Sequence, residues 1–373
     1  MESKAEWQLY ESMPNRAVAA CGQQPNMQAM TLRLSVLDQS PIPSGTSGGD
    51  ALRNTINLAQ TADRLGYHRY WLAEHHASPA LAGASPEVLI GSVAAATSRI
   101  RVGSGGIMLP HYSPLKIAEN FSILAGLYPD RIDLGLGRAP GSDQATAYAL
   151  QRDRRQRSPD DFPNQLAELL AYFDDAMPAG HPFARYGATL PGGADKPVAW
   201  LLGSSPDSAR WAAEVGLPYC FADFINPGGA SIAAAYRREF KPSARLDAPE
   251  TAVAVWTICA DTLAEAEHLA TSARMMMAHL LMGMSIPVPT PDAAAAWLAE
   301  NPQAAALGGR RRVVLGDKGM VRRGIEAAAA EYGAGEVLLV NILHDHAARV
   351  RSYELVAEAF DLSGSGTGAM RNG

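Results

Sequence analysis

The chain has 373 residues, of which 47% are hydrophobic and 19% charged, and its formal net charge is −6. This is the composition of a globular protein, so a collagen-like, coiled-coil or wholly disordered chain is excluded. The mild acidity argues against a nucleic-acid partner, because such proteins usually carry a basic surface. The length alone allows two domains or one large α/β barrel with insertions.

The three cysteines, Cys21, Cys220 and Cys259, are widely scattered, and no two of them have the C-x-x-C spacing. This pattern favours a reduced, cytoplasmic protein over a disulfide scaffold or a structural zinc site. No apolar run reaches the roughly 20 residues that a membrane-spanning helix needs, so we expect no membrane partner. Residues 1–30 lack the apolar core of a secretory signal, and we interpret them as a flexible N-terminal extension.

From residue 31 onward, short apolar runs alternate with amphipathic stretches. Eight strands are predicted, at residues 32–37, 68–73, 100–109, 131–137, 198–202, 218–221, 251–259 and 336–342. Each is followed by a predicted helix, at residues 50–65, 85–98, 115–127, 162–173, 206–215, 230–240, 263–281 and 347–360. Parallel strands need crossover connections, so eight such units predict an α/β fold, a (β/α)8 TIM barrel with insertions, over residues 31–362. An open doubly wound sheet is the alternative.

Two stretches, at about residues 177–197 and 282–309, interrupt the repeat. Loops of this length in a compact domain are usually functional, and we expect residues 282–309 to form a lid over the site. Residues 363–373, rich in Gly and Ser, are interpreted as a flexible tail.

Polar residues gather where the predicted strands end. In barrel enzymes the active site lies at the C-terminal ends of the strands, so these residues are candidates for it. They are Glu74-His75-His76, Gly103-Ser104-Gly105-Gly106, His111, Gly137-Arg138, Gly203-Ser204-Ser205, Asp223, Asp261 and His344-Asp345-His346.

The segment Gly203-Ser204-Ser205-Pro206-Asp207-Ser208 has the pattern of a strand, a glycine turn and a capped helix start. Free backbone N–H groups and a partial positive charge at a helix start suit a phosphate group. Arg138, one strand away, is placed to grip the same phosphate. The alternative is that Ser-Pro-Asp only caps the helix and that Arg138 forms an ion pair at the rim.

The segment Glu74-His75-His76 allows two kinds of chemistry. His75 could handle protons, because histidine titrates near neutral pH. It could instead bind a metal together with His344 and His346. Adjacent residues that leave a strand point in different directions, so His75 and His76 do not suit one metal, and we expect no metal site.

Taken together, these motifs resemble those of the bacterial luciferase-like family of flavin-dependent monooxygenases. The resemblance extends from about Leu32 to Phe360, and it is the order and spacing of the motifs that is specific. Its markers are Trp71-Leu72-Ala73-Glu74-His75-His76, Arg101-Val102-Gly103-Ser104-Gly105-Gly106-Ile107-Met108-Leu109-Pro110, Asp130-Arg131-Ile132-Asp133-Leu134-Gly135-Leu136-Gly137-Arg138, Gly203-Ser204-Ser205-Pro206-Asp207-Ser208 and Asn341-Ile342-Leu343-His344-Asp345-His346.

The resemblance implies a flavin site, because the family binds FMN or, in one branch, the deazaflavin F420. It implies that His75 is catalytic, that Glu74 lies near the flavin, and that Gly105-Gly106 passes along the isoalloxazine ring. Family members often carry a cis peptide bond at this last position. The cofactor phosphate would be held by Arg138 and by the turn formed by Gly203, Ser204, Ser205 and Ser208. Luciferase has a cysteine where this chain has Gly137.

The activity that the resemblance implies is a monooxygenase reaction. FMN, reduced by a separate NAD(P)H:flavin reductase, would react with O2 through a C4a-peroxyflavin and insert one oxygen atom into a small organic substrate. His75 would manage protons while the lid excludes water. Relatives often pair through helices near the second and third strands, so a homodimer is expected.

Three alternatives stay open. The chain could bind flavin without catalysis, or it could be an F420-dependent oxidoreductase on the same fold. The third is a metal-dependent barrel hydrolase that uses His75, His344 and His346.

Overall fold

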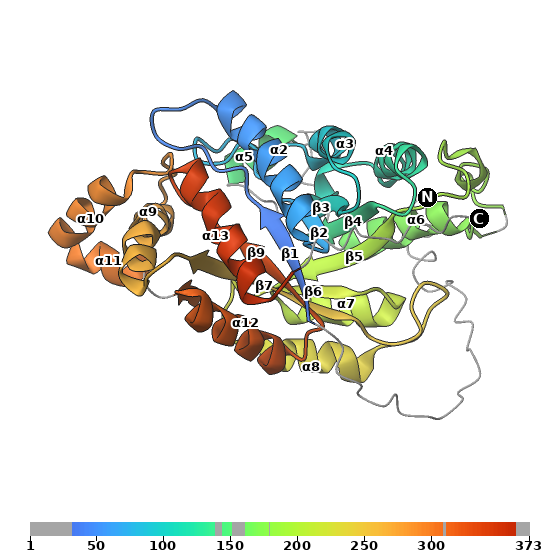
Figure 1. Ribbon diagram of the computed structural model, residues 1–373. Coiled ribbons are helices and arrows are strands. Elements are labelled where there is room, and N and C mark those ends of the chain that lie inside the picture. Colours follow the sequence, from blue (N-terminus) through green and yellow to red (C-terminus); the bar gives the residue numbers. More distant parts are fainter. Residues whose placement is uncertain (1–31, 139–143, 151–160, 179, 309–310, 363–373) are drawn as a thin grey trace, which may run out of the picture.

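The computed structural model describes residues 32–138, 144–150, 161–178, 180–308 and 311–362 (Figure 1). The expectations about residues 1–30 and 363–373 lie outside the described residues. Within them, parallel strands form the centre of the molecule and helices cover the outside (Figure 1). The strands are β1 (Arg33–Asp38), β2 (Arg69–Leu72), β3 (Arg101–Met108), β4 (Ile132–Gly137), β5 (Val198–Gly203), β6 (Tyr219–Ala222), β7 (Thr251–Cys259), β8 (Val313–Gly316) and β9 (Glu336–Val340).

The sheet closes on itself, which confirms the predicted TIM barrel. Its strand order is β6-β5-β4-β3-β2-β1-β9-β7, and β6 also pairs with β7, so these eight strands form a ring. Every pairing in the ring is parallel, as crossover helices require. The open doubly wound sheet is thereby excluded.

The ninth strand, β8, was missed by the sequence prediction. The long strand β7 pairs with β6 through residues 251–254 and with β8 through residues 256–259. β8 therefore continues the sheet beyond the end of β6 and lies outside the closed ring. Its four residues directly follow a run of arginines, and so short a run gives little periodic signal.

The helices that follow the strands agree closely with the predicted ones. They are α2 (Gly48–Leu65), α3 (Pro86–Ala96), α4 (Pro114–Leu127), α6 (Phe162–Asp174), α7 (Pro206–Val215), α8 (Ala230–Glu239), α9 (Leu263–Leu281) and α13 (His346–Ala359). Further helices that the prediction missed are α5 (Gln144–Leu150), α10 (Pro291–Glu300), α11 (Pro302–Gly308) and α12 (Lys318–Tyr332). Short 3-10 turns are η1 (Leu109–His111) and η2 (Gly187–Thr189). None of the helices in the described ranges is long and apolar enough to cross a membrane.

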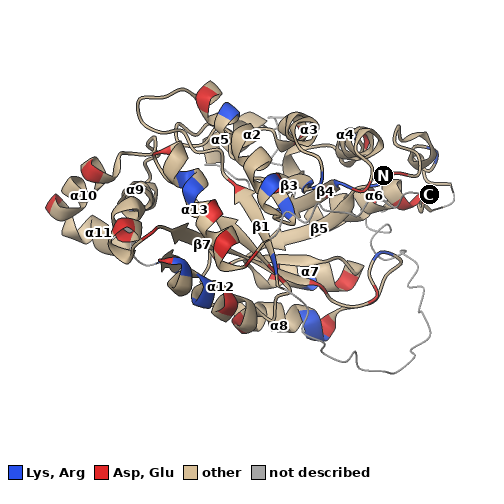
Figure 2. Ribbon diagram, viewed as in Figure 1, with Lys and Arg blue, Asp and Glu red and all other residues tan. Residues whose placement is uncertain are grey.

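Charges of both signs are interspersed on the outer helices α8, α12 and α13 (Figure 2). Some of them pair between helices, such as Lys318 of α12 with Glu358 of α13 at 3.1 Å. Others pair along one helix, such as Arg322 with Glu326 at 2.9 Å. Exposed pairs of this kind contribute little to stability, so the apolar faces beneath them hold the helices on the barrel.

The described part of the second interruption, residues 282–308, lies beside α9 at one end of the barrel (Figure 1). It contains α10 and α11, both packed against α9. Val288 joins it to the loop after β1, donating to Ile42 O at 2.9 Å and accepting from Ser44 N at 2.8 Å. Val288 also packs in the apolar cluster inside the barrel, together with Met276 and Met277 of α9. Val288 thus ties the start of this segment to the loop after β1 and to the interior cluster, and the role of the segment as a lid stays a prediction.

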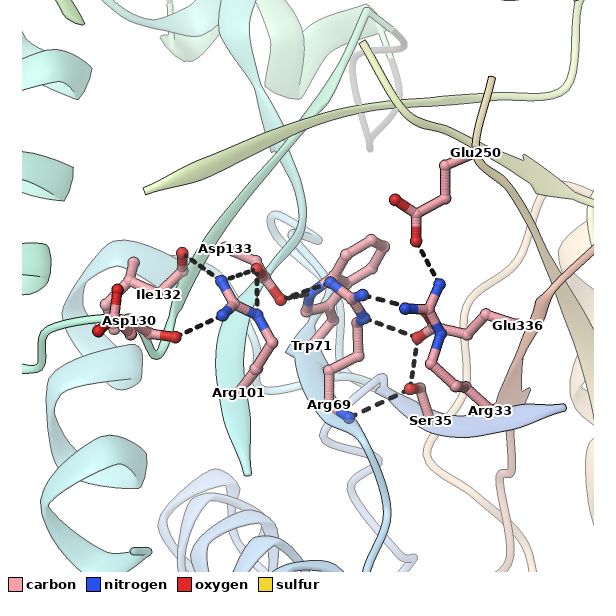
Figure 3. Close-up of polar contacts among 10 residues, drawn as sticks. All are labelled: Arg33, Ser35, Arg69, Trp71, Arg101, Asp130, Ile132, Asp133, Glu250 and Glu336. Atoms are coloured by element: carbon pink, nitrogen blue, oxygen red, sulfur yellow. Dashed lines mark hydrogen bonds and ion pairs between the residues drawn. The ribbon is translucent and has the colours of Figure 1, made fainter. Parts of the chain in front are cut away.

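The lower interior of the barrel is filled by charged side chains. Figure 3 shows them in a row of alternating sign that runs Glu250, Arg33, Glu336, Arg69, Asp133, Arg101. The Arg69 guanidinium lies 2.6 Å from Glu336 and 2.9 Å from Asp133, and all three side chains are buried. Buried charges are tolerated only when they are paired, and three acids here face three bases. We call this row the floor of the barrel.

Candidate active site

The site begins just above the floor, where two tryptophans cross the interior. The rings of Trp71 and Trp200 meet edge to face with their centroids 5.4 Å apart. Trp71 donates its indole N–H to Asp133 at 3.0 Å, and the Arg69 guanidinium lies 4.6 Å from the Trp200 ring centroid. The floor therefore fixes the orientation of the aromatic layer on which the site rests.

Glu74 leaves the end of β2 and is almost fully buried, with 1% of its surface exposed. Its carboxylate accepts from the Met108 backbone N–H at 2.9 Å and from the Tyr112 hydroxyl at 3.1 Å, and it lies 2.7 Å from His76 Nε2. Burial and then the Glu74 charge raise the pKa of Tyr112, so this hydroxyl stays protonated and donates. Glu74 therefore ties the end of β2 to the end of β3.

His75, the next residue, has a different environment. Its backbone N–H donates to Gly83 O at 2.8 Å, which holds the main chain. Its ring atom Nδ1 is buried and has no hydrogen-bond partner among the described residues. Burial and then the neighbouring His76 lower the pKa of His75 to about 4, so the ring is neutral at pH 7. A neutral imidazole offers one N–H and one lone pair, which suits proton handling.

Gly105 and Gly106 lie in β3 and are joined by a cis peptide bond. The pairing of β3 with β4 shifts register here, between Gly105 and Ile107. A Cβ at Gly105 would lie 2.4 Å from Leu37 Cδ1, and one at Gly106 would lie 2.7 Å from Gly135 O. Neither position has room for a side chain, so this stretch presents bare backbone to the interior.

The serine turn, residues 203–208, joins β5 to α7. Ser205 caps the helix, since its hydroxyl accepts from the Ser208 backbone N–H at 3.4 Å. Asn226 donates to Ser204 O at 2.9 Å and so fixes the turn from the loop after β6. The Ser204 hydroxyl has no protein partner in the described part of the chain, so it stays available for a ligand.

Ser208 differs from the other two serines of the turn. Its side chain is 7% exposed, and its hydroxyl donates to Ser205 O at 2.8 Å and lies 3.0 Å from the Tyr219 hydroxyl. A Cβ at Gly203 would lie 2.3 Å from the Ser208 Oγ, so only glycine leaves room for this packing. A hydroxyl has one proton to donate, and that of Ser208 is already used. Ser208 and Gly203 thus shape the turn, and we assign the phosphate role to other groups.

Arg138 follows β4 and reaches the first turn of α7. Its Nη1 lies 3.9 Å from Asp207 Oδ2, and its guanidinium lies 5.2 Å from the Trp211 ring centroid. The structure therefore places Arg138 beside the serine turn in the rim ion pair of the alternative interpretation, and its role at a phosphate stays a prediction. The ion pair with Asp207 is partly exposed, which places the guanidinium at the rim of the barrel beside the first turn of α7.

Two interior side chains that the sequence analysis missed carry buried nitrogen atoms without partners among the described residues. They are Gln39 Nε2 and Trp200 Nε1. Gln39 is 4% exposed and directly follows β1. It alternates along the chain with Ser35, which contacts the floor, and Leu37, which packs in the interior cluster, so it is on the same inward face. A buried unpaired amide costs about 1–3 kcal/mol, so it points to a ligand atom that completes the bond.

The histidines of the proposed metal set are not brought together. His344 Nε2 lies 3.3 Å from Ser44 O, and His346 Nε2 lies 2.8 Å from Asn57 Oδ1. Across the described ranges, no group of three or more His, Cys, Asp and Glu side chains is arranged as metal ligands. The donor set therefore does not fit the metal-dependent hydrolase alternative.

The closed parallel barrel carries a half-buried neutral histidine and the N-terminus of a capped helix at its strand ends. This is the architecture of a barrel enzyme. The family model of luciferase-like monooxygenases matches residues 30–353. The chain therefore belongs to the luciferase-like monooxygenases, and its class is that of oxidoreductases that incorporate oxygen from O2.

The relatives cover nearly the whole barrel. A luciferase-like monooxygenase of Escherichia coli is 42% identical over 89% of this chain and 98% of its own length. An N-acetyl-S-alkylcysteine monooxygenase of Bacillus subtilis is 36% identical over 88% of this chain and 98% of its own length. The crystal structure of apo-MsnO8 is 40% identical with a TM-score of 0.81, covering 90% of this chain and 99% of that one.

Proposed function

We propose that the protein is a flavin-dependent monooxygenase that uses FMN, reduced by a separate NAD(P)H:flavin reductase, together with O2 to oxygenate a small organic substrate. The observation that carries this proposal is His75, a half-buried neutral histidine whose buried Nδ1 atom has no partner among the described residues, at the mouth of a barrel that also holds Arg138 and the serine turn. One end of this site suits proton transfer and the other suits a phosphate group.

The residues present fit FMN. Arg138, the Ser204 hydroxyl and the start of α7 would hold its phosphate, and the bare backbone of Gly105-Gly106 and the partnerless Gln39 Nε2 would face its ring system. Bound reduced flavin supplies the activation of O2. F420 also carries a phosphate, so it is the alternative cofactor.

The chain's own residues then have distinct tasks. His75 exchanges a proton with the reacting groups through its ring nitrogens, which it can do because it is uncharged at pH 7. Glu74 is a positioning residue, because its carboxylate is occupied by Met108, Tyr112 and His76 and fixes the main chain next to His75.

Residues of α9 and the segment after it exclude water. Met276, Met277 and Val288 pack against the interior apolar cluster from above, which lowers the local dielectric around the reacting groups. This packing supports the role of residues 282–309 as a lid.

Exposed apolar side chains support a homodimer. Val88 of α3 and Ile123 and Leu127 of α4 are exposed by 73%, 45% and 66%, on two adjacent helices. A second copy of the chain would cover them. We place the protein in the cytoplasm, where reduced flavin and thiols are maintained.

The proposal is tested by mixing the protein and reduced FMN with O2 and following flavin absorbance and hydrogen peroxide release. Wild type is expected to delay reoxidation and peroxide release relative to free reduced FMN, and His75→Asn to shorten the delay. His268→Asn, at an exposed histidine of α9, is the matched control. Reoxidation as fast as that of free reduced FMN, or no effect of His75→Asn, contradicts the proposal.

The cofactor is tested separately by titration with FMN, riboflavin and F420. Arg138→Gln is expected to weaken FMN binding about tenfold and to leave riboflavin binding unchanged, because only FMN carries the phosphate. Binding of F420 but not FMN would show that this site holds the deazaflavin, and the protein would then be an F420-dependent oxidoreductase.

A further inference from the structure

Two adjacent arginines precede β8, and they differ in how their charges are compensated. Arg312 is paired with two carboxylates: its Nε lies 3.1 Å from Asp223 Oδ2 and its Nη2 2.5 Å from Asp223 Oδ1, and it also bonds Glu331. Arg311 bonds only the Phe224 carbonyl oxygen, at 2.6 Å, and no carboxylate of the described residues pairs with it. Arg312 thus anchors the segment, whereas the charge of Arg311 is not compensated by a carboxylate of the described residues.

The guanidinium of Arg311 is half-buried at the edge of the interior apolar cluster. The Phe224 oxygen that it contacts also accepts from Trp256 Nε1 at 3.2 Å, so the guanidinium and the Trp256 indole share one acceptor beside the interior cluster. The rings of Phe224 and Trp256 meet edge to face at 6.0 Å, and both pack with Met276 and Met277 in the interior cluster. Burial lowers the pKa of Arg311, and no acidic neighbour opposes this.

Arg138 and Arg311, two cations near the mouth of the barrel, therefore have different environments. Arg138 lies at the start of α7, beside the serine turn, and suits the phosphate of the cofactor. Arg311 lies just past the end of β6 and beside the middle of β7, next to the aromatic residues Phe224 and Trp256. A half-buried cation next to an apolar wall is compensated best by a ligand that has one anionic group and an apolar body.

We propose that Arg311 binds the anionic group of the substrate and that the substrate is an organic anion whose apolar part lies against Phe224, Trp256, Met276 and Met277. This rests on the proposed function, whose substrate class it names. A guanidinium can bond a carboxylate or a sulfonate through two parallel N–H groups, so it would fix the orientation of the apolar part toward the flavin.

The test measures binding rather than turnover, with octanoate and 1-octanol as probes that share an apolar chain. Each is titrated into FMN-loaded protein by calorimetry, with tryptophan fluorescence as a second readout because Trp256 lies next to the proposed site. Wild type is expected to bind octanoate at least tenfold more tightly than octanol. Arg311→Met should abolish this preference, and Arg311→Lys should keep part of it.

Arg322→Met is the matched control, because Arg322 lies on the exposed face of α12 and pairs with Glu326. This variant should keep the full preference for octanoate. The proposal is overturned if wild type does not prefer octanoate or if Arg311→Met keeps the preference. It is also overturned if Arg311→Met weakens FMN binding tenfold, since Arg311 would then belong to the phosphate site. Failure of the proposed function would be seen instead in the oxygen experiment, which does not depend on these probes.

Discussion

The indole N–H of Trp71 points down into the barrel and lies 3.0 Å from Oδ2 of Asp133, so one carboxylate serves both the charged floor and the aromatic layer above it. The same oxygen accepts from Arg69 at 2.9 Å, and the other oxygen accepts from Arg101 at 2.6 Å. The orientation of the aromatic layer and the neutrality of the floor therefore depend on one residue.

Asp133→Asn should destabilise the protein strongly. The substitution removes one negative charge between two arginines, and breaking a buried ion pair costs about 3–5 kcal/mol. Urea unfolding measures the loss. Glu326→Gln breaks an exposed pair with Arg322 and should cost no more than about 0.5 kcal/mol, as the control. Equal effects of the two changes would show that the floor does not support the barrel.

Gly105→Ala should destabilise the protein by about 1–3 kcal/mol through overpacking, because the new methyl group would lie 2.4 Å from Leu37 Cδ1. Combining it with Leu37→Ala removes the clash, so the double variant should lose less than the sum of the single changes. Gly91→Ala in α3 is the control, since its methyl group would meet only Leu124 Cδ2 at 3.7 Å. Strict additivity in thermal or urea unfolding would refute the contact.

Stability should fall as the pH decreases from about 6.5 to 4, partly because of His75. Its folded-state pKa of about 4 lies below the unfolded value of 6.5, so in this range the unfolded chain binds a proton that the folded chain does not. The shift corresponds to about 3 kcal/mol. Burial also lowers the pKa values of His68 and His346, so their contribution is separated by comparing wild type with His75→Gln at pH 7 and pH 4.5. A variant with the wild-type pH dependence would contradict this assignment.

Gln39→Leu should have opposite effects on the empty and the loaded protein. Without ligand it removes a buried amide that lacks a partner, which should stabilise the protein by about 1 kcal/mol. With FMN it removes a hydrogen-bond donor, so the dissociation constant should rise about tenfold. Gln165→Leu in α6 is the control, because Gln165 Oε1 is also buried without a partner but lies outside the barrel. It should leave FMN binding unchanged, and an unchanged dissociation constant for Gln39→Leu would exclude Gln39 from the site.

The ring of strands was predictable because each strand carries its own apolar run, and β7, predicted at residues 251–259, has the same bounds in the structure. The local geometry of the serine turn was predictable for a similar reason, since Ser205 caps its own helix. The contact of the Ser208 hydroxyl with the Tyr219 hydroxyl was not predictable, because Tyr219 belongs to the next strand. Nor could the sequence identify Gln39 and Arg311, because a missing partner is a property of the packed chain.

The hydrogen bonds of Val288 affect how a substrate could enter the site. The segment proposed as the lid is held at its first end by the hydrogen bonds of Val288 to Ile42 and Ser44. At its far end it is held by the pairing of β8 with β7 and of Arg312 with Asp223. A segment that is held at one end can move away as a whole, whereas a segment that is held at both ends can move only between them. In the proposed role as a lid, this segment would therefore admit a substrate only if α10 and α11 separate from α9, against which both are packed.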